Sequence, residues 1–135
     1  MSFEERSHTA DILMHIRAPD LPGLFSDAGR ALMKIMYRGD AGSDTEMTIT
    51  VTGTSPEHLL HTFLSELLFT TEVENIVFSE IVISIDEGTV HAKLAGEPFQ
   101  MAVHGGGTEV KGISWHGLAI SHDTDEYSCD VLFDV

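Results

Sequence analysis

A leucine-rich run between residues 59 and 68 is the sequence feature that most constrains the fold. Its apolar residues recur at spacings of three and four, the period of one face of an α-helix: Leu59, Leu60, Phe63, Leu64, Leu67 and Leu68. Ser55 is a candidate N-cap, and Pro56 suits the first helical position. A helix with such an apolar face must bury it against another layer of structure.

A second helix is predicted from Asp20 to about Tyr37. Asp20 is the candidate N-cap, Pro22 is tolerated in the first turn, and Gly39 is a candidate stop. The apolar stripe of this helix is formed by Leu21, Leu24, Phe25, Ala28, Leu32, Ile35 and Met36. The sequence therefore predicts two amphipathic helices.

Much of the remaining chain has the patterns of β-strands and turns. Strands are predicted at 3–8, 11–18, around 47–51, 76–86, 89–96, 108–120 and 126–135, with turns at 87–88 and 123–125. Helices separate the early strands, and the late strands form a meander. This order predicts an α+β fold in which two helices pack on a largely antiparallel mixed sheet. A length of 135 residues predicts one domain over residues 1–135.

The charge and cysteine content limit the possible functions. A net charge of −15 opposes direct binding of RNA or DNA and suits a cation, a basic protein partner or simple solubility. No apolar run approaches the length of a membrane span, and the first residues lack the parts of a signal peptide. The single cysteine, Cys129, cannot form an internal disulfide; we expect a buried, inert thiol in a cytoplasmic protein.

Three oxygen-bearing groups near the chain ends are candidate metal ligands: Asp11, Asp134 and the terminal carboxylate of Val135. Strand alternation places Asp11 and Asp134 on the more polar faces of their predicted strands. Carboxylates are the ligands that calcium and magnesium prefer. The alternative is that Asp11 is an ordinary strand-start residue and the C-terminus is frayed. Spacing alone does not decide between these interpretations.

Other polar motifs are weaker indications of a site. The eight histidines include no HxH or HExxH spacing, so zinc is not favoured, and His58 and His61 are predicted to be solvated on the polar side of their helix. His8 could orient a neighbouring carboxylate. The glycines at 105–107 precede a predicted strand without a following GKS or GKT, which favours a flexible connection over a phosphate loop. Trp115 is predicted to be a core or an interface residue.

Five motifs follow one another along the chain: HTAD at 8–11, EHLLHTFLSELLF at 57–69, GEPF at 96–99, TEVKGISWH at 108–116 and FDV at 133–135. In this combination the chain resembles the archease family over essentially its whole length. It departs from the family pattern at 100–104. Family members often carry an acidic residue and an Arg-His pair there, and this chain keeps only the histidine. Gly112 and Trp115 also replace the usual alanine and tyrosine.

The resemblance implies a protein cofactor and not an enzyme. Archeases assist the RtcB-type RNA ligase, which joins a 3′-phosphate or 2′,3′-cyclic phosphate end to a 5′-hydroxyl in tRNA splicing or RNA repair. They promote GTP-dependent guanylylation of the ligase's histidine and multiple turnover. A protein of this kind would contact tRNA or other RNA only indirectly, through the ligase. By the same resemblance, Asp11, Asp134 and Val135 would bind a divalent cation, with calcium expected and magnesium or manganese as alternatives.

Two other functions stay open at this point. The first is a small metal-dependent phosphoester hydrolase that uses the same carboxylates with His8 as the base. The second is an acidic binding or chaperone-like module that recognises a basic partner and needs no metal.

Overall fold

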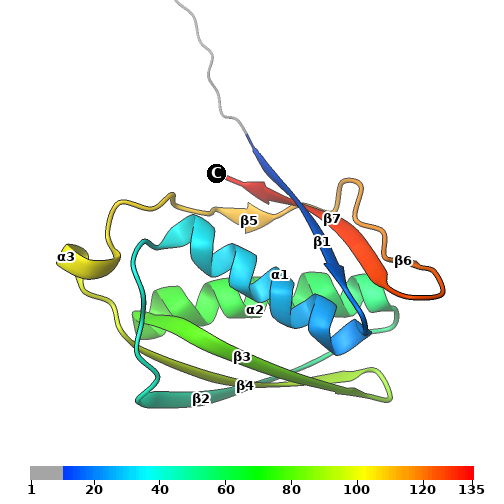
Figure 1. Cartoon of the computed structure of the whole chain (residues 1–135), viewed down its shortest axis with the longest axis horizontal. Coiled ribbons are helices and arrows are strands. Elements are labelled where there is room, and N and C mark those ends of the chain that lie inside the picture. Colours follow the sequence, from blue (N-terminus) through cyan, green and yellow to red (C-terminus); the bar gives the residue numbers. More distant parts are fainter. Residues whose placement is uncertain (1–10) are drawn as a thin grey trace, which may run out of the picture.

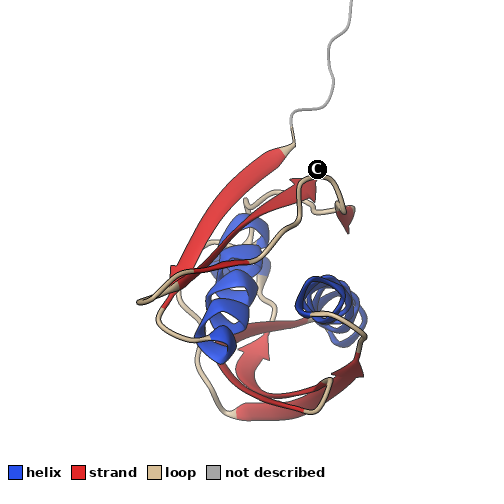
Figure 2. Cartoon of the chain, turned by 90° about the vertical axis from the view of Figure 1, so that its right-hand side faces the viewer, coloured by secondary structure: helices blue, strands red, loops and turns tan. Residues whose placement is uncertain are grey.

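Two long helices lie between two β-sheets in the computed structural model, which describes residues 11–135 (Figures 1 and 2). The helices are α1 (Leu21–Met36), α2 (Pro56–Glu74) and the short α3 (Met101–His104). The strands are β1 (Ile12–Ala18), β2 (Thr45–Thr52), β3 (Ile76–Asp86), β4 (Thr89–Pro98), β5 (Gly112–Ile113), β6 (Ser121–His122) and β7 (Tyr127–Asp134). The predicted α+β class is confirmed, with the described strands divided between two sheets. The strand predicted at 3–8 lies outside the described residues.

The first sheet joins segments from both ends of the chain. Strand β1 pairs antiparallel with β7 from Ile12 opposite Phe133 to Ala18 opposite Tyr127. Strands β5 and β6 also pair antiparallel with β7, toward opposite ends of it. Figure 1 shows this as the blue β1 lying against the red β7, so the described start and the end of the chain share one sheet.

The second sheet has the order β2-β4-β3, with both pairings antiparallel. A tight hairpin joins β3 to β4 at the turn predicted from Glu87 and Gly88. Both residues have positive φ, 46° and 75°, as a two-residue hairpin turn requires. Glycine adopts this conformation without steric cost, which explains why the sequence signal was strong here.

Both predicted N-caps are confirmed. An Asp20 carboxylate oxygen accepts a hydrogen bond from the Gly23 amide at 2.8 Å, and the Ser55 hydroxyl oxygen accepts one from the His58 amide at 3.1 Å. Helix α2 ends at Glu74, and the next residue, Asn75, adopts the left-handed conformation that commonly terminates helices. Helix α1 ends at Met36, before the predicted stop at Gly39.

The apolar faces of the two long helices meet each other and both sheets. Helix α1 packs mainly on β3 and β1, whereas α2 packs mainly on β2 (Figure 2). The Phe25 and Phe63 rings lie at the helix contact, with centroids 6.1 Å apart. Fully buried apolar side chains come from all three layers and include Phe25, Phe63, Phe133, Leu24, Leu32, Leu60, Leu64, Leu67, Ile81 and Leu94. Burial of this apolar area is the main stabilising contribution to the fold.

The prediction of a strand at 108–120 was wrong over most of that segment. Only Gly112 and Ile113 form β5, while α3 and β6 were not predicted. The Thr108 amide donates to the Ile35 carbonyl at the end of α1, which draws the chain away from the sheet before β5. After β5, the Leu118 amide donates to the Trp115 carbonyl in a turn containing Gly117, whose φ is +69°. A tertiary contact before β5 and a local turn after it therefore override the strand pattern.

None of the helices in the described part of the chain combines the length and apolarity needed to cross a membrane.

Candidate functional site

Asp11 and Asp134 lie at the same end of the first sheet. The β1–β7 register pairs Ile12 with Phe133, so continuing it by one residue sets Asp11 across from Asp134. Residues opposite each other on antiparallel strands have Cβ atoms about 4.5–5.5 Å apart and project from the same face. Asp11 is exposed and Asp134 is half-buried. Two like charges so placed repel each other unless a cation or a proton intervenes.

Strand β5 borders the Asp134 side chain. Gly112 pairs with Asp134, and the Lys111 amide donates to the Asp134 carbonyl at 2.7 Å. A Cβ built on Gly112 would lie 3.7 Å from one Asp134 carboxylate oxygen. Glycine at this position therefore leaves open space beside the carboxylate.

Val135 ends the chain next to this pair of aspartates. It is half-buried, and its side chain packs against the core. Such packing against the core restrains a last residue that directly follows Asp134. His8, the candidate that could orient a carboxylate, lies outside the described residues.

The candidate metal ligands at this end of the sheet all offer oxygen atoms. The ion pairs within residues 11–135 join His15 to Asp130, Arg17 to Glu126, Arg30 to Asp27 and His104 to Glu97, so none includes Asp11 or Asp134. No cluster of three or more His, Cys, Asp or Glu side chains able to hold a metal occurs in that range. The candidate ligands here remain the two aspartates, the Val135 carboxylate and water, a donor set of oxygens of the kind that calcium and magnesium accept.

His58 and His61 help to hold the segment between β5 and β6 against α2. His61 Nε2 lies 2.8 Å from the Ile113 carbonyl oxygen, and the indole of Trp115 stacks on the His61 ring with centroids 3.9 Å apart. The Thr54 amide donates to His58 Nδ1. Both histidines are half-buried, so the prediction that they are solvated was wrong. Trp115 is 55% exposed, which places it at the surface and not in the core.

The sequence interpretation missed His104, which is fully buried at the end of α3. The Gln100 amide donates to His104 Nδ1 at 3.0 Å, so the proton of a neutral ring is on Nε2. That Nε2 lies 2.8 Å from a Glu97 carboxylate oxygen, within ion-pair distance but without hydrogen-bond geometry. The sequence did contain an indication of this residue, because His104 is the one residue in 100–104 that matches the family pattern.

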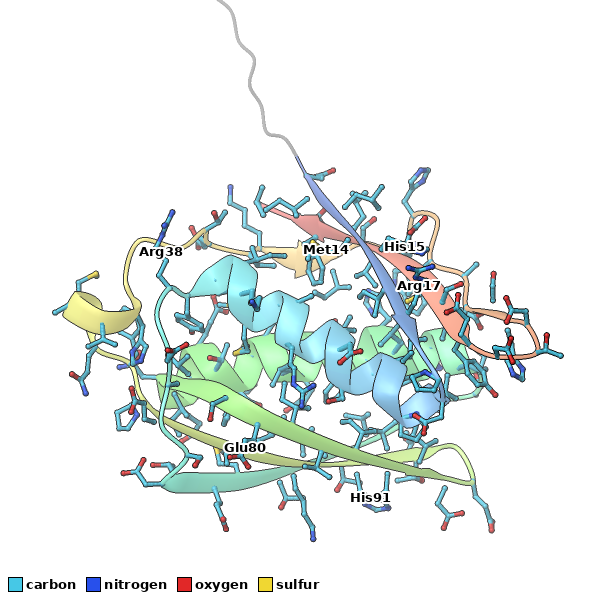
Figure 3. All side chains as sticks on the ribbon, viewed as in Figure 1. Met14, His15, Arg17, Arg38, Glu80 and His91 are labelled. Carbon is cyan, nitrogen blue, oxygen red and sulfur yellow. The ribbon has the colours of Figure 1, made fainter. Side chains whose placement is uncertain are left out.

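The glycines at 105–107 connect α3 to β5 and pack tightly. A Cβ on Gly107 would lie 2.0 Å from the Met36 carbonyl oxygen, and Arg38 Nε donates to the Gly106 carbonyl at 2.6 Å. Figure 3 shows Arg38 beside this loop at the end of α1. The predicted flexible connection is a connection, but it is closely packed, and close backbone approach explains its glycines.

The thiol of Cys129 is buried on β7. Burial raises its pKa to about 11, and the charges of Asp130 and Glu57 act in the same direction. The reactive thiolate is therefore scarce at neutral pH, in agreement with the predicted inert cysteine.

Comparison with known proteins places this chain in a family. The model of the Archease protein family (MTH1598/TM1083) matches residues 3–135. The chain belongs to the archease family. A protein archease-like of Dictyostelium discoideum is 30% identical over 141 residues, covering 99% of this chain and 93% of that protein. The resemblance that the sequence motifs indicated is thus confirmed.

Solved structures agree with the archease assignment. The solution structure of Methanobacterium thermoautotrophicum protein 1598 superposes with a TM-score of 0.81 at 26% identity, covering 96% of each chain. An archease from Thermotoga maritima, described as a possible chaperone, superposes with a TM-score of 0.75 at 18% identity over 100% of this chain and 98% of that one. The archease fold therefore extends over nearly the whole chain.

Proposed function

We propose that this protein activates an RtcB-type RNA ligase by promoting GTP-dependent guanylylation of the ligase's histidine and multiple turnover. In this proposal a divalent cation, expected to be calcium, binds to Asp11, Asp134 and the Val135 carboxylate. The protein acts as a cofactor of the ligase and catalyses no reaction of its own. Membership of the archease family supports the partner, and the β1–β7 register beside Asp11 and Asp134 is the observation that carries the proposal.

Electrostatics supplies a physical reason for a cation at this end of the sheet. With a net charge of −15, the chain repels both the triphosphate of GTP and RNA. A bound divalent cation supplies positive charge that offsets the charge of a nearby phosphate. Asp11 and Asp134 would hold the cation at an end of the sheet, from which it can approach a nucleotide bound to a partner. Lys111, the neighbour of Gly112, is exposed next to the same site and adds a fixed positive charge.

The deciding experiment measures guanylylation of the cognate ligase with GTP in the presence and absence of this protein. Asp134→Asn is compared with Asp130→Asn, which removes the same charge from the same face of β7 four residues earlier. We expect the wild type and Asp130→Asn to stimulate guanylylation and Asp134→Asn to lose most of the stimulation. Equal stimulation by the two variants would refute the role of the metal site, and no stimulation by the wild type would refute the proposed function.

Calorimetry with calcium, magnesium and manganese addresses the other functions. Binding of one of these ions that Asp134→Asn abolishes and Asp130→Asn preserves is the result expected here. An absence of binding for all three ions would favour the metal-independent module. Phosphoester turnover by the purified protein alone, lost in Asp11→Asn, would favour the hydrolase.

A further inference from the structure

Strand β2 is an edge strand of the second sheet. Among the described strands it pairs only with β4, and this pairing runs without a register shift from Thr45 opposite Gly96 to Thr52 opposite Thr89. In an edge strand, alternate backbone amides and carbonyls point away from the sheet and are available to another strand. Strand β2 therefore presents a straight row of hydrogen-bonding groups.

Apart from the charge of Glu46, the edge lacks the features with which proteins usually block such pairing. The sequence of β2, TEMTITVT, has no proline, lysine or arginine, and its ladder has no bulge. The opposite edge, β3, differs because its register shifts between Phe78 and Glu80. A bulge twists a strand and interrupts its ladder, so β3 is a poorer template than β2.

A groove of about 290 Å³ runs between β2 and α2. Its lining comes from Met47, Thr48, Ile49 and Thr50 on the strand and from Glu66, Phe69, Thr70, Val73 and Glu74 on the helix. Phe69 and Val73, one helical turn apart, are 59% and 60% exposed. Figure 2 shows α2 nearly end-on above one side of the second sheet. An apolar helix wall thus stands beside the free strand edge.

The charges around the groove are acidic. Glu66 and Glu74 line it, Glu46 belongs to β2, and no lining residue is basic. None of these glutamates takes part in an ion pair within residues 11–135. An occupant with lysine or arginine would complement them, whereas a second copy of this chain would bring its own Glu46 and its own net charge of −15.

We propose that the groove between β2 and α2 binds an extended segment of a basic partner protein as an additional β-strand. The backbone of the segment pairs with the free edge of β2, and alternate apolar side chains contact Phe69 and Val73. Lysine or arginine residues flanking the apolar positions face Glu66 and Glu74. The groove belongs to the second sheet and the aspartate pair to the first, so this binding is independent of the proposed metal site.

The test uses a synthetic capped peptide in which alternating valine and threonine are flanked by two lysines at each end. NMR spectra of the isotope-labelled full chain are recorded as this peptide is added. We expect amide shifts confined to residues 45–52 and 66–74. A matched peptide with glutamate in place of lysine should bind at least about tenfold more weakly, because like charges then oppose each other.

Two pairs of variants locate the binding surface. Val73→Ser should weaken binding at least about tenfold, whereas Val82→Ser should leave it unchanged, since Val82 is equally exposed (61%) on the outer face of β3. Glu66→Lys should weaken binding of the lysine peptide, and Glu80→Lys, also on the outer face of β3, should not. All four substituted side chains are exposed, so each variant is expected to fold.

Four results would overturn the proposal. These are no binding at millimolar peptide, shifts centred on another surface, equal affinity for the two peptides, and equal effects of Val73→Ser and Val82→Ser. A fifth result would also overturn it: concentration-dependent shifts of residues 45–52 without peptide, which would assign the edge to self-association. Stimulation of the ligase is measured separately, so failure here leaves the proposed function standing.

Discussion

Ile12 lies directly across from Phe133, and this pair fixes the position of the candidate metal site. Phe133 is fully buried, whereas Ile12 is half-buried and packs against the core. A slip of one residue would turn each strand's apolar face toward solvent, so burial specifies the register. The same register sets Asp11 across from Asp134 at the end of the sheet.

Calcium should stabilise the wild-type protein and not Asp134→Asn. A cation that binds only the folded state adds about 2.7 kcal/mol at one hundred times its Kd. In EDTA, Asp134→Asn should be slightly more stable than the wild type, because it removes a like charge opposite Asp11. Thermal unfolding in calcium and in EDTA measures both effects, with Asp130→Asn as the control. A wild-type Tm that calcium does not raise would contradict the proposed site.

Substitution of Gly107 by alanine should destabilise the fold by about 3 kcal/mol. The new Cβ would lie 2.0 Å from the Met36 carbonyl oxygen, so the loop or the end of α1 must move. Gly112→Ala is the control, because its Cβ meets Asp134 at an ordinary 3.7 Å and should cost about 0.5 kcal/mol or less. Urea unfolding gives both free energies. Equal stabilities would mean that the loop is not packed as closely as the structure indicates.

Loss of the His104 side chain should cost about 3 kcal/mol. His104→Ala leaves the Gln100 amide without its acceptor and opens a cavity next to Phe99, whose ring centroid lies 6.1 Å from that of His104. His91→Ala is the matched control, since His91 points away from the core on β4 (Figure 3). Denaturant unfolding compares the two variants. A His104→Ala protein as stable as His91→Ala would show that the buried imidazole is dispensable.

Stability should fall with rising pH through the ionisation of Cys129. The folded-state pKa of the thiol is raised from an ordinary value of 9.0 to about 11, mainly by burial. The folded state therefore holds this proton more tightly than the unfolded state, and the resulting stability is complete below pH 9 and lost as the pH rises through 11. The difference in free energy of unfolding between the wild type and Cys129→Ala, measured from pH 8 to 11, isolates this group. A pH-independent difference would contradict the raised pKa.

Local chemistry made several elements predictable from the sequence. Asp20 and Ser55 satisfy amides within three residues of themselves, and Glu87 and Gly88 provide the positive φ angles of a hairpin. Because these interactions are short-range, the sequence pattern contains their whole cause. The strand prediction at 108–120 failed for the opposite reason, since backbone hydrogen bonds tie this segment to α1 and β7.

The sequence by itself determined the two helices, their N-caps and the polar faces that carry Asp11 and Asp134. Alternation tells which face of a strand is polar but not which strand it pairs with, so the division into two sheets was not predictable from it. Only the tertiary structure decided that β1 pairs with β7 and brings together residues more than 120 positions apart. The physical reason is that burial of Ile16, Cys129, Val131 and Phe133 against the helices selects that pairing. The approach of the two aspartates follows from it.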